Sequence, residues 1–385
     1  MIKFGKIIFP LGIIILLIII AVFFFRDRFF SAFYEPTQTS LQEGIKTNIG
    51  REGFEENQEN TFEIIAGNLQ IPWEIAFLPE GDILVTERPG TLKRIGKEGR
   101  TYIIDGVQHV GEGGLLGMAL HPRFSENRWI YLYLTTAAGN GLKNRVERYR
   151  LEDDRLAEKK VIIDNIPGAA NHDGGRIAFG PDDYLYITTG DAGNTELAQN
   201  TDSLAGKILR AKDDGSIPID NPFGNAVYSY GHRNSQGLAW DNKGRLWATE
   251  HGRSGILSGL DELNFIEKGK NYGWPVIQGD ERREGMRSPV IQSGPDETWA
   301  PAGLVFLSNS LFFGGLRGEA LYEAQIIGEK QISIRNHFRN EFGRIRAVVL
   351  GPDGFLYITT SNTDGRGEPK TNDDKIIRIN PLVFF

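Results

Sequence analysis

One pattern recurs along most of the chain: a turn rich in proline, glycine, aspartate or asparagine, followed by a short strand. Gly180–Asp183 before Tyr184–Thr188 is a clear copy, and Gly351–Gly354 before Phe355–Ile358 is another. Six copies lie about 40–70 residues apart, a spacing typical of repeat architectures. The predicted strands are Ile83–Thr86, Trp129–Tyr133, Tyr184–Thr188, Arg245–Trp247, Leu311–Gly314 and Phe355–Ile358.

Turns that bound strands of β-branched and aromatic residues at this period predict an all-β fold, a six-bladed β-propeller. A propeller must close its ring, because the first and last blades would otherwise leave strand edges unpaired. Phe62–Ala66 and Lys375–Ile379 are suitable strands at the two ends of the repeats, and we expect them to pair. Loops on one face of a propeller surround its central channel, so polar residues far apart in sequence can converge there.

The N-terminus predicts one transmembrane helix. Lys3 and Lys6 precede 19 apolar residues, 7–25, and Arg26–Arg28 follows at once. At ~1.5 Å per residue this run spans about 28 Å, close to the bilayer core, and no small-residue cleavage site ends it. We expect a membrane anchor at 1–28, a polar tether at 29–60 and a propeller at 61–385, with the propeller on the extracytoplasmic side.

Composition removes several classes of function. The chain has no cysteine, which excludes disulfides, thiolate metal sites and cysteine nucleophiles. The formal charge of -7 gives no sign of a nucleic-acid partner, which would need a basic face.

A histidine and an aspartate flank the third strand in glycine-rich turns. His172 lies in Asn171–Arg176, and Asp191 lies in Thr189–Asn194. An unperturbed histidine titrates at a pKa of about 6.5, which suits proton transfer near neutrality. Asp191 could orient such a base and stabilise its protonated form. The alternative is a turn histidine beside a capping aspartate.

Further polar, glycine-rich loops carry arginines. Arg233, Arg317, Arg344 and Arg346 would repel one another on one face unless they meet anions, which arginine binds well. The alternative is that each is a solvated loop charge. The loops concerned are 111–116, 230–237, 250–253, 261–264, 271–275, 315–318 and 343–346.

These loops carry a family resemblance. The motifs NHDGGR, TTGDAGN, GHRNSQG, DELN, NYGWP and GRIR occur in this order over about residues 68–380. Together they resemble the soluble quinoprotein sugar dehydrogenases. The resemblance implies a propeller that carries pyrroloquinoline quinone (PQQ) and calcium on one face. Such an enzyme oxidises the anomeric carbon of an aldose sugar to a lactone and passes electrons to an external acceptor.

The resemblance also implies roles for individual residues. His172 matches the general base, which takes a proton from the sugar while hydride passes to the quinone, and Asp191 matches its supporting carboxylate. Arg233 and Asn234 match groups that contact the quinone and stabilise the negative charge that develops on its oxygen, which gives Arg233 a catalytic role. Arg317, Arg344 and Arg346 match positions that face the cofactor carboxylates. The carbonyls of Gly252 and Arg253 match ligands of the cofactor's calcium. Glu262 and the Tyr272 carbonyl match ligands of a second calcium.

Three positions depart from the family pattern. Glu112 stands at a cofactor-site position where the glucose-oxidising members have glutamine, and Arg317 stands where a lysine is familiar. Arg253 replaces a proline and begins a longer insert, 253–260, which leaves the backbone there less fixed. Two other functions stay open on the sequence: a non-enzymatic, membrane-tethered propeller that binds a sugar or protein partner, and a calcium-dependent lactonase.

Overall fold

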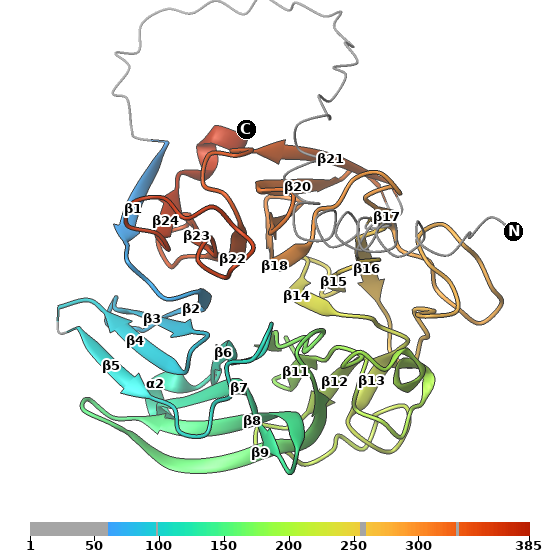
Figure 1. The fold of residues 1–385 in the computed structure, drawn as a ribbon, viewed down its shortest axis with the longest axis horizontal. Helices are drawn as coiled ribbons and strands as arrows, with labels where there is room; N and C mark the ends of the chain where they lie inside the picture. Colours follow the sequence, from blue (N-terminus) through green and yellow to red (C-terminus); the bar gives the residue numbers. More distant parts are fainter. Residues whose placement is uncertain (1–60, 98, 255–258, 329–330) are drawn as a thin grey trace, which may run out of the picture. The chain divides into compact units, whose positions relative to one another are not determined.

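The computed structural model describes residues 61–385 except 98, 255–258 and 329–330, and its strands form six four-stranded antiparallel sheets. Figure 1 shows these sheets arranged as blades around a common centre. The predicted six-bladed propeller is therefore confirmed. In each blade the first strand lies nearest the centre and pairs with a neighbour on one side only.

The blades are numbered along the chain. Blade 1 contains β2 (Pro72–Phe77), β3 (Ile83–Glu87), β4 (Thr91–Ile95) and β5 (Arg100–Ile103). Blade 2 contains β6 (Leu115–Leu120), β7 (Trp129–Ala138), β8 (Gly141–Leu151) and β9 (Leu156–Gly168). Blade 3 contains β10 (Ile177–Phe179), β11 (Leu185–Thr188), β12 (Lys207–Ala211) and β13 (Val227–Tyr230).

The second half of the ring follows the same plan. Blade 4 contains β14 (Ser235–Trp240), β15 (Leu246–Glu250), β16 (Glu262–Ile266) and β17 (Ile291–Gln292). Blade 5 contains β18 (Pro301–Leu307), β19 (Ser310–Gly315), β20 (Ala320–Ile326) and β21 (Ile332–His337). Blade 6 contains β22 (Ile345–Leu350), β23 (Leu356–Thr360), β24 (Ile376–Ile379) and β1 (Phe62–Ala66). Short helices are α2 (Phe124–Asn127) and the 3₁₀ turns Thr195–Gln199 and Pro381–Phe384.

Each of the six predicted strands coincides with the second strand of a blade, β3, β7, β11, β15, β19 and β23. Three of them begin one residue later than predicted, and the preceding turn explains why. The amides of Tyr184 and Phe355 donate to the side chains of Asp182 and Asp353 at 3.3 and 3.2 Å. The turn aspartate therefore binds the backbone group that the sheet would otherwise use.

The ring closes as predicted from the two ends of the repeats. β1 pairs antiparallel with β24, with Phe62 opposite Ile379 and Ile64 opposite Ile377. The Phe62 ring meets Phe342 edge to face at 4.9 Å, which fixes the closing strand against blade 6.

Neighbouring blades are joined by hydrogen bonds from threonines near the ends of second strands. The hydroxyl of Thr86 donates to the Leu116 carbonyl at 2.6 Å, and that of Thr249 donates to the Ala302 carbonyl at 2.7 Å. The inner strands of neighbouring blades also approach each other closely where glycine is present. A Cβ on Gly117, for example, would lie 2.2 Å from the Gly175 carbonyl oxygen of blade 3.

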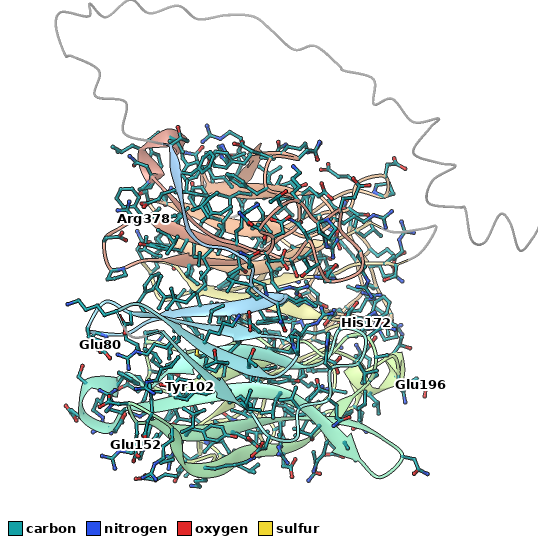
Figure 2. The ribbon with its side chains drawn as sticks, turned by 60° about the vertical axis from the view of Figure 1, so that its left-hand side comes forward. Glu80, Tyr102, Glu152, His172, Glu196 and Arg378 are labelled. Carbon is teal, nitrogen blue, oxygen red and sulfur yellow. The ribbon has the colours of Figure 1, made fainter. Side chains whose placement is uncertain are left out.

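Because the strands alternate in direction, all connections between blades and all connections from second to third strands reach one face, here called the upper face. His172 belongs to this face, whereas Glu80 lies in a turn on the lower face. The side view in Figure 2 shows His172 and Glu80 toward opposite edges of the molecule.

The predicted anchor at 7–25 and the tether at 29–60 lie outside the described residues. Within the part of the chain that the structure describes, no helix is long and apolar enough to span a membrane.

Candidate active site

His172 and Asp191 meet on the upper face, as the sequence predicts. The Nδ1 atom of His172 lies 2.7 Å from Oδ1 of the fully buried Asp191. Burial alone would favour the neutral acid. Hydrogen bonds from His172, from the Gly193 amide and from the Trp274 indole outweigh it, so the pKa of Asp191 lies below its usual value. An ionised Asp191 requires the proton on Nδ1, which leaves Nε2 with a free electron pair.

The backbone holds His172 in a left-handed conformation, with φ of 60°. Its amide donates to Glu112 Oε2 at 3.1 Å, and its carbonyl accepts from the Ala192 amide at 3.2 Å. Gly190 lies against the same carbonyl: a Cβ at this position would be 1.7 Å from the oxygen. The glycine of the Thr189–Asn194 motif is therefore required by the close approach of the loops that carry the base and its carboxylate.

Arg233 lies on the other side of the histidine ring. One of its terminal nitrogens donates to His172 Nε2 at 2.8 Å and to the Ser254 hydroxyl at 2.6 Å. The guanidinium also lies 5.4 Å from the ring centre of Trp274. The predicted base and the predicted quinone contact are thus in direct contact, and Arg233 engages the electron pair that proton transfer needs.

Polar atoms without a hydrogen-bond partner gather next to this pair. Among the described residues they include Nδ2 of Asn234, Oδ2 of Asp173 and Nε2 of His251, all buried. Burial raises the pKa of Asp173 to about 6 and lowers the pKa of His251 to about 3. Leaving such groups unpaired is costly, so their concentration here indicates a site for a polar ligand.

Asp173 and His251 border a small cavity at the upper end of the channel. Its lining comes from five of the six blades or the loops between them and comprises Trp73, Glu112, Asp173, Gly174, Gln236, His251, Leu316, Arg346 and Arg366.

Arg344 and Arg346 share one acidic partner. Arg344 binds the carboxylate of Asp364 at 2.9 Å, and Arg346 lies 3.7 Å from the same oxygen. Arg88 lies within electrostatic reach of this group. Arg346 also lines the cavity at the channel mouth, and Arg344 is linked to it through Asp364.

Arginines and carboxylates are interspersed around the His172–Asp191 pair and the channel mouth. Three carboxylates, Glu112, Asp191 and Asp364, have lowered pKa values and are ionised near neutrality. Five arginines surround them, namely Arg88, Arg233, Arg344, Arg346 and Arg366. The cluster is therefore suited to an anionic ligand.

Glu112 has a partner that the sequence did not suggest. Arg366, 254 residues away, donates to Glu112 Oε1 at 2.7 Å. This hydrogen bond, together with the charge of Arg366, outweighs the effect of burial and lowers the pKa of Glu112 to about 2. The negative charge that departs from the family pattern is thus compensated within the site.

Arg317 is the remaining arginine predicted at the cofactor. It lies in the turn between β19 and β20, and its side chain is exposed. The carbonyl of its neighbour Leu316 accepts from Arg344 at 2.9 Å, so the turn borders the arginine cluster.

The residues predicted to bind calcium border another small cavity beside Arg233, lined by Gly252, Arg253, Glu262 and Tyr272 among others. Burial and the neighbouring Glu250 charge raise the pKa of Glu262 to about 8. The buried Oδ1 of Asn264, whose amide donates to Glu262, has no partner. No group of three or more His, Asp or Glu side chains in the described ranges is placed to hold a metal.

Several site residues were not singled out from the sequence, among them Arg88, Trp274, Asp364 and Arg366. Trp274 lies in a quoted motif, but its indole bond of 2.8 Å to Asp191 spans 83 residues. Asp364 and Arg366 lie in a glycine-containing turn after the sixth predicted strand, and this turn was the available signal.

The fold and the site define a propeller protein with a hydrogen-bonded histidine–aspartate pair beside an arginine cluster. The sequence pattern of the glucose/sorbosone dehydrogenase family matches residues 69–377. The chain therefore belongs to the glucose/sorbosone dehydrogenase family, and it is an oxidoreductase.

Three relatives illustrate the similarity. Aldose sugar dehydrogenase YliI of Escherichia coli is 34% identical over 342 residues, covering 79% of this chain and 90% of that protein. Quinoprotein glucose dehydrogenase B of Acinetobacter calcoaceticus is 35% identical over 254 residues, covering 56% and 52%. The structure of the PQQ-bound aldose sugar dehydrogenase of Streptomyces coelicolor is 41% identical, with a TM-score of 0.76, and covers 83% of this chain and 97% of that chain.

Proposed function

We propose that this protein oxidises the anomeric hydroxyl of an aldose sugar, with pyrroloquinoline quinone as cofactor on the upper face. The observation that carries the proposal is the His172–Asp191 pair, held at 2.7 Å beside the arginine cluster. The names of two relatives, an aldose sugar dehydrogenase and a quinoprotein glucose dehydrogenase, support the substrate class and the cofactor.

The residues at the site fit such a cofactor. PQQ carries three carboxylates, and the arginines of the cluster supply the opposite charge. Arg344 and Arg346 would hold the carboxylates, since arginine binds these groups bidentately. Asn234, whose buried Nδ2 lacks a partner, would donate to a cofactor oxygen. When bound, the quinone supplies the two-electron acceptor that no side chain provides.

His172 would hold and move the proton of the reaction. Its Nδ1 proton is committed to Asp191, so Nε2 is the atom that can accept a proton from the sugar hydroxyl. Arg233 now donates to that atom at 2.8 Å. A substrate hydroxyl must therefore take the place of the Arg233 contact, and Asp191 then stabilises the imidazolium.

Calcium is part of the proposal. The Gly252 and Arg253 carbonyls would bind a cation at the cofactor, since calcium accepts backbone oxygens. Glu262 would hold a second calcium together with the Tyr272 carbonyl. The raised pKa of Glu262 and the unpartnered Oδ1 of Asn264 both fit a bound cation, which would compensate the two adjacent buried carboxylates.

We further propose that residues 7–25 anchor the enzyme in a membrane, with the propeller on the extracytoplasmic side. An external quinone or redox protein would then collect the electrons. The apolar run and its basic flanks support this arrangement.

The test is reconstitution. Purified protein given calcium and PQQ should oxidise aldoses and reduce an added dye, and a sample given calcium alone should not. A folded protein that binds PQQ without oxidising any of a panel of aldoses would contradict the sugar substrate. A folded protein that does not bind PQQ would contradict the cofactor.

A further inference from the structure

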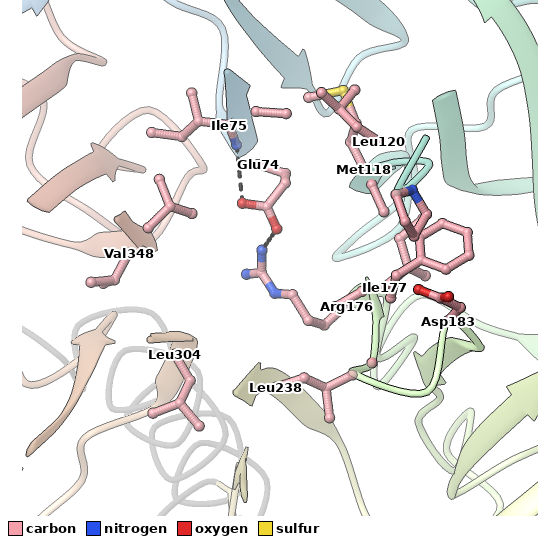
Figure 3. Close-up of a pocket in the computed structure, with 17 residues that line it drawn as sticks. Glu74, Ile75, Met118, Leu120, Arg176, Ile177, Asp183, Leu238, Leu304 and Val348 are labelled. Carbon is pink, nitrogen blue, oxygen red and sulfur yellow. Dashed lines mark hydrogen bonds and ion pairs between the residues drawn. The ribbon is translucent and has the colours of Figure 1, made fainter. Parts of the chain in front are cut away.

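A second cavity lies at the lower end of the central channel, away from the upper-face site. Its volume is about 490 Å³, and every blade contributes to its wall. The wall includes one apolar residue from each first strand, namely Ile75, Met118, Ile177, Leu238, Leu304 and Val348. Figure 3 shows these side chains around the lumen. Because first strands pair on one side only, their free backbone edges also face this space.

A buried ion pair forms the inner end of the cavity. In Figure 3 the Arg176 side chain extends across the lumen to Glu74, and the two groups are in contact. The equivalent positions in the other four blades are occupied by small residues: Gly117, Gly237, Gly303 and Ala347. Only blades 1 and 3 therefore place a long polar side chain at this level of the channel.

Arg176 makes several contacts, but one of its N–H donors has no hydrogen-bond partner. Its Nε donates to the Gln236 carbonyl at 2.9 Å, and its guanidinium lies 4.2 Å from the ring centre of Trp73. Arg176 is 5% exposed, and its Nη2 has no hydrogen-bond partner. A buried donor without an acceptor is unusual in a protein core, and Arg176 belongs to the wall of this cavity.

We propose that the lower end of the channel binds a small, uncharged, largely apolar molecule whose carbonyl or hydroxyl oxygen accepts a hydrogen bond from Arg176. The volume lies in the range of small-molecule sites, about 300–1,000 Å³. Glu74 already balances the charge of Arg176, so an anionic ligand would meet the Glu74 carboxylate. This site does not depend on the redox chemistry of the upper face.

An aromatic ketone, 1-tetralone, is a suitable probe, and its parent hydrocarbon tetralin is the matched control. Calorimetric titration of the purified full-length chain, with a buffer-and-detergent blank, should give saturable one-to-one binding of 1-tetralone and weaker binding of tetralin. Val349→Trp, at a half-buried position of the lower wall, should abolish binding of both. Ile103→Trp makes a similar change on an exposed strand of blade 1 and should change neither.

The polar contact is tested by the double variant Glu74→Gln/Arg176→Met, which leaves no unpaired buried charge. It should weaken 1-tetralone binding about 2- to 10-fold, the effect of one hydrogen bond, and leave tetralin binding unchanged. The proposal is overturned if wild-type protein shows no saturable binding, if binding survives Val349→Trp, or if wild type binds both probes equally. If the double variant does not fold, the wild-type comparison of the two probes decides.

Discussion

Arg233 donates a hydrogen bond of 2.8 Å to Nε2 of His172, the ring nitrogen opposite the one that binds Asp191. Both nitrogens of the base are therefore engaged, one by an anion and one by a cation. The anion orients the ring, whereas the cation occupies the electron pair of Nε2 that the proposed proton transfer needs. The histidine, the aspartate and the arginine come from three separate loops.

Replacing the base should separate chemistry from binding. His172→Gln should lower turnover about 10²- to 10⁴-fold, the usual contribution of a general base, while PQQ binding and the unfolding midpoint stay near the wild-type values. Asp191→Asn should cause a smaller loss and move the acid-side fall of activity to lower pH, because the imidazolium loses a nearby negative charge. Unchanged turnover in well-folded His172→Gln would contradict the assignment.

Trp274 should act through Asp191 and Arg233. Trp274→Phe removes the indole N–H that donates to Asp191 at 2.8 Å. It also weakens the cation–π contact between the ring and the Arg233 guanidinium. Since the acceptor is ionised, we expect a loss of about 1.5–3 kcal/mol in the stability of the loop arrangement and roughly a 10-fold fall in turnover. Trp240→Phe, at a half-buried position against Tyr186, is the matched control and should leave turnover unchanged.

The arginine cluster and its acidic partner should act in opposite directions on cofactor binding. Arg344→Ala or Arg346→Ala should weaken PQQ binding about 10- to 150-fold, as expected for the loss of a charge-assisted hydrogen bond. Asp364→Asn should tighten it, because this carboxylate competes for both arginines at 2.9 and 3.7 Å. A titration with PQQ, monitored by fluorescence, measures the binding affinity without enzyme turnover. Equal affinities in all variants would exclude the cluster from the cofactor site.

Asp173 should make the protein less stable as the pH rises. Burial raises its pKa from 3.8 to about 6, so the folded chain binds the proton more tightly than the unfolded chain. Stability from this group is present below about pH 4 and is lost as the pH rises through about 6. Asp173→Asn should therefore gain up to about 3 kcal/mol relative to wild type between pH 4 and pH 7.5.

Urea unfolding at several pH values measures this difference. Asp154→Asn, which changes an exposed carboxylate of blade 2, should show no such pH-dependent gain. A constant difference between wild type and Asp173→Asn across the pH range would show that the carboxyl is not perturbed.

The membrane anchor is tested by fractionation. The full-length chain should stay with membranes through high-salt and alkaline washing, because burial of 19 apolar residues resists both. A shortened chain that begins near Thr61 should be soluble and folded. Release of the full-length protein by either wash would contradict an anchor at residues 7–25.

Much of the architecture follows from local sequence. The turn-and-strand repeat predicted all six second strands, and the end segments predicted the closing pair β1 and β24, because turn chemistry and strand alternation act over a few residues. The His172–Asp191 pair was also predictable, since both residues lie in glycine-rich turns at the two ends of the strand pair β10 and β11. Resemblance to a family added Arg344 and Arg346.

Contacts between distant blades were decided only by the tertiary structure. Ring closure brings Arg366 to Glu112 across 254 residues, and a long connection in blade 4 brings Trp274 to Asp191. Glu74 and Arg176 meet across the channel because their strands lie two blades apart around it. No local pattern encodes these pairs, because each depends on how the blades curve and close, and that is set by packing between all six sheets.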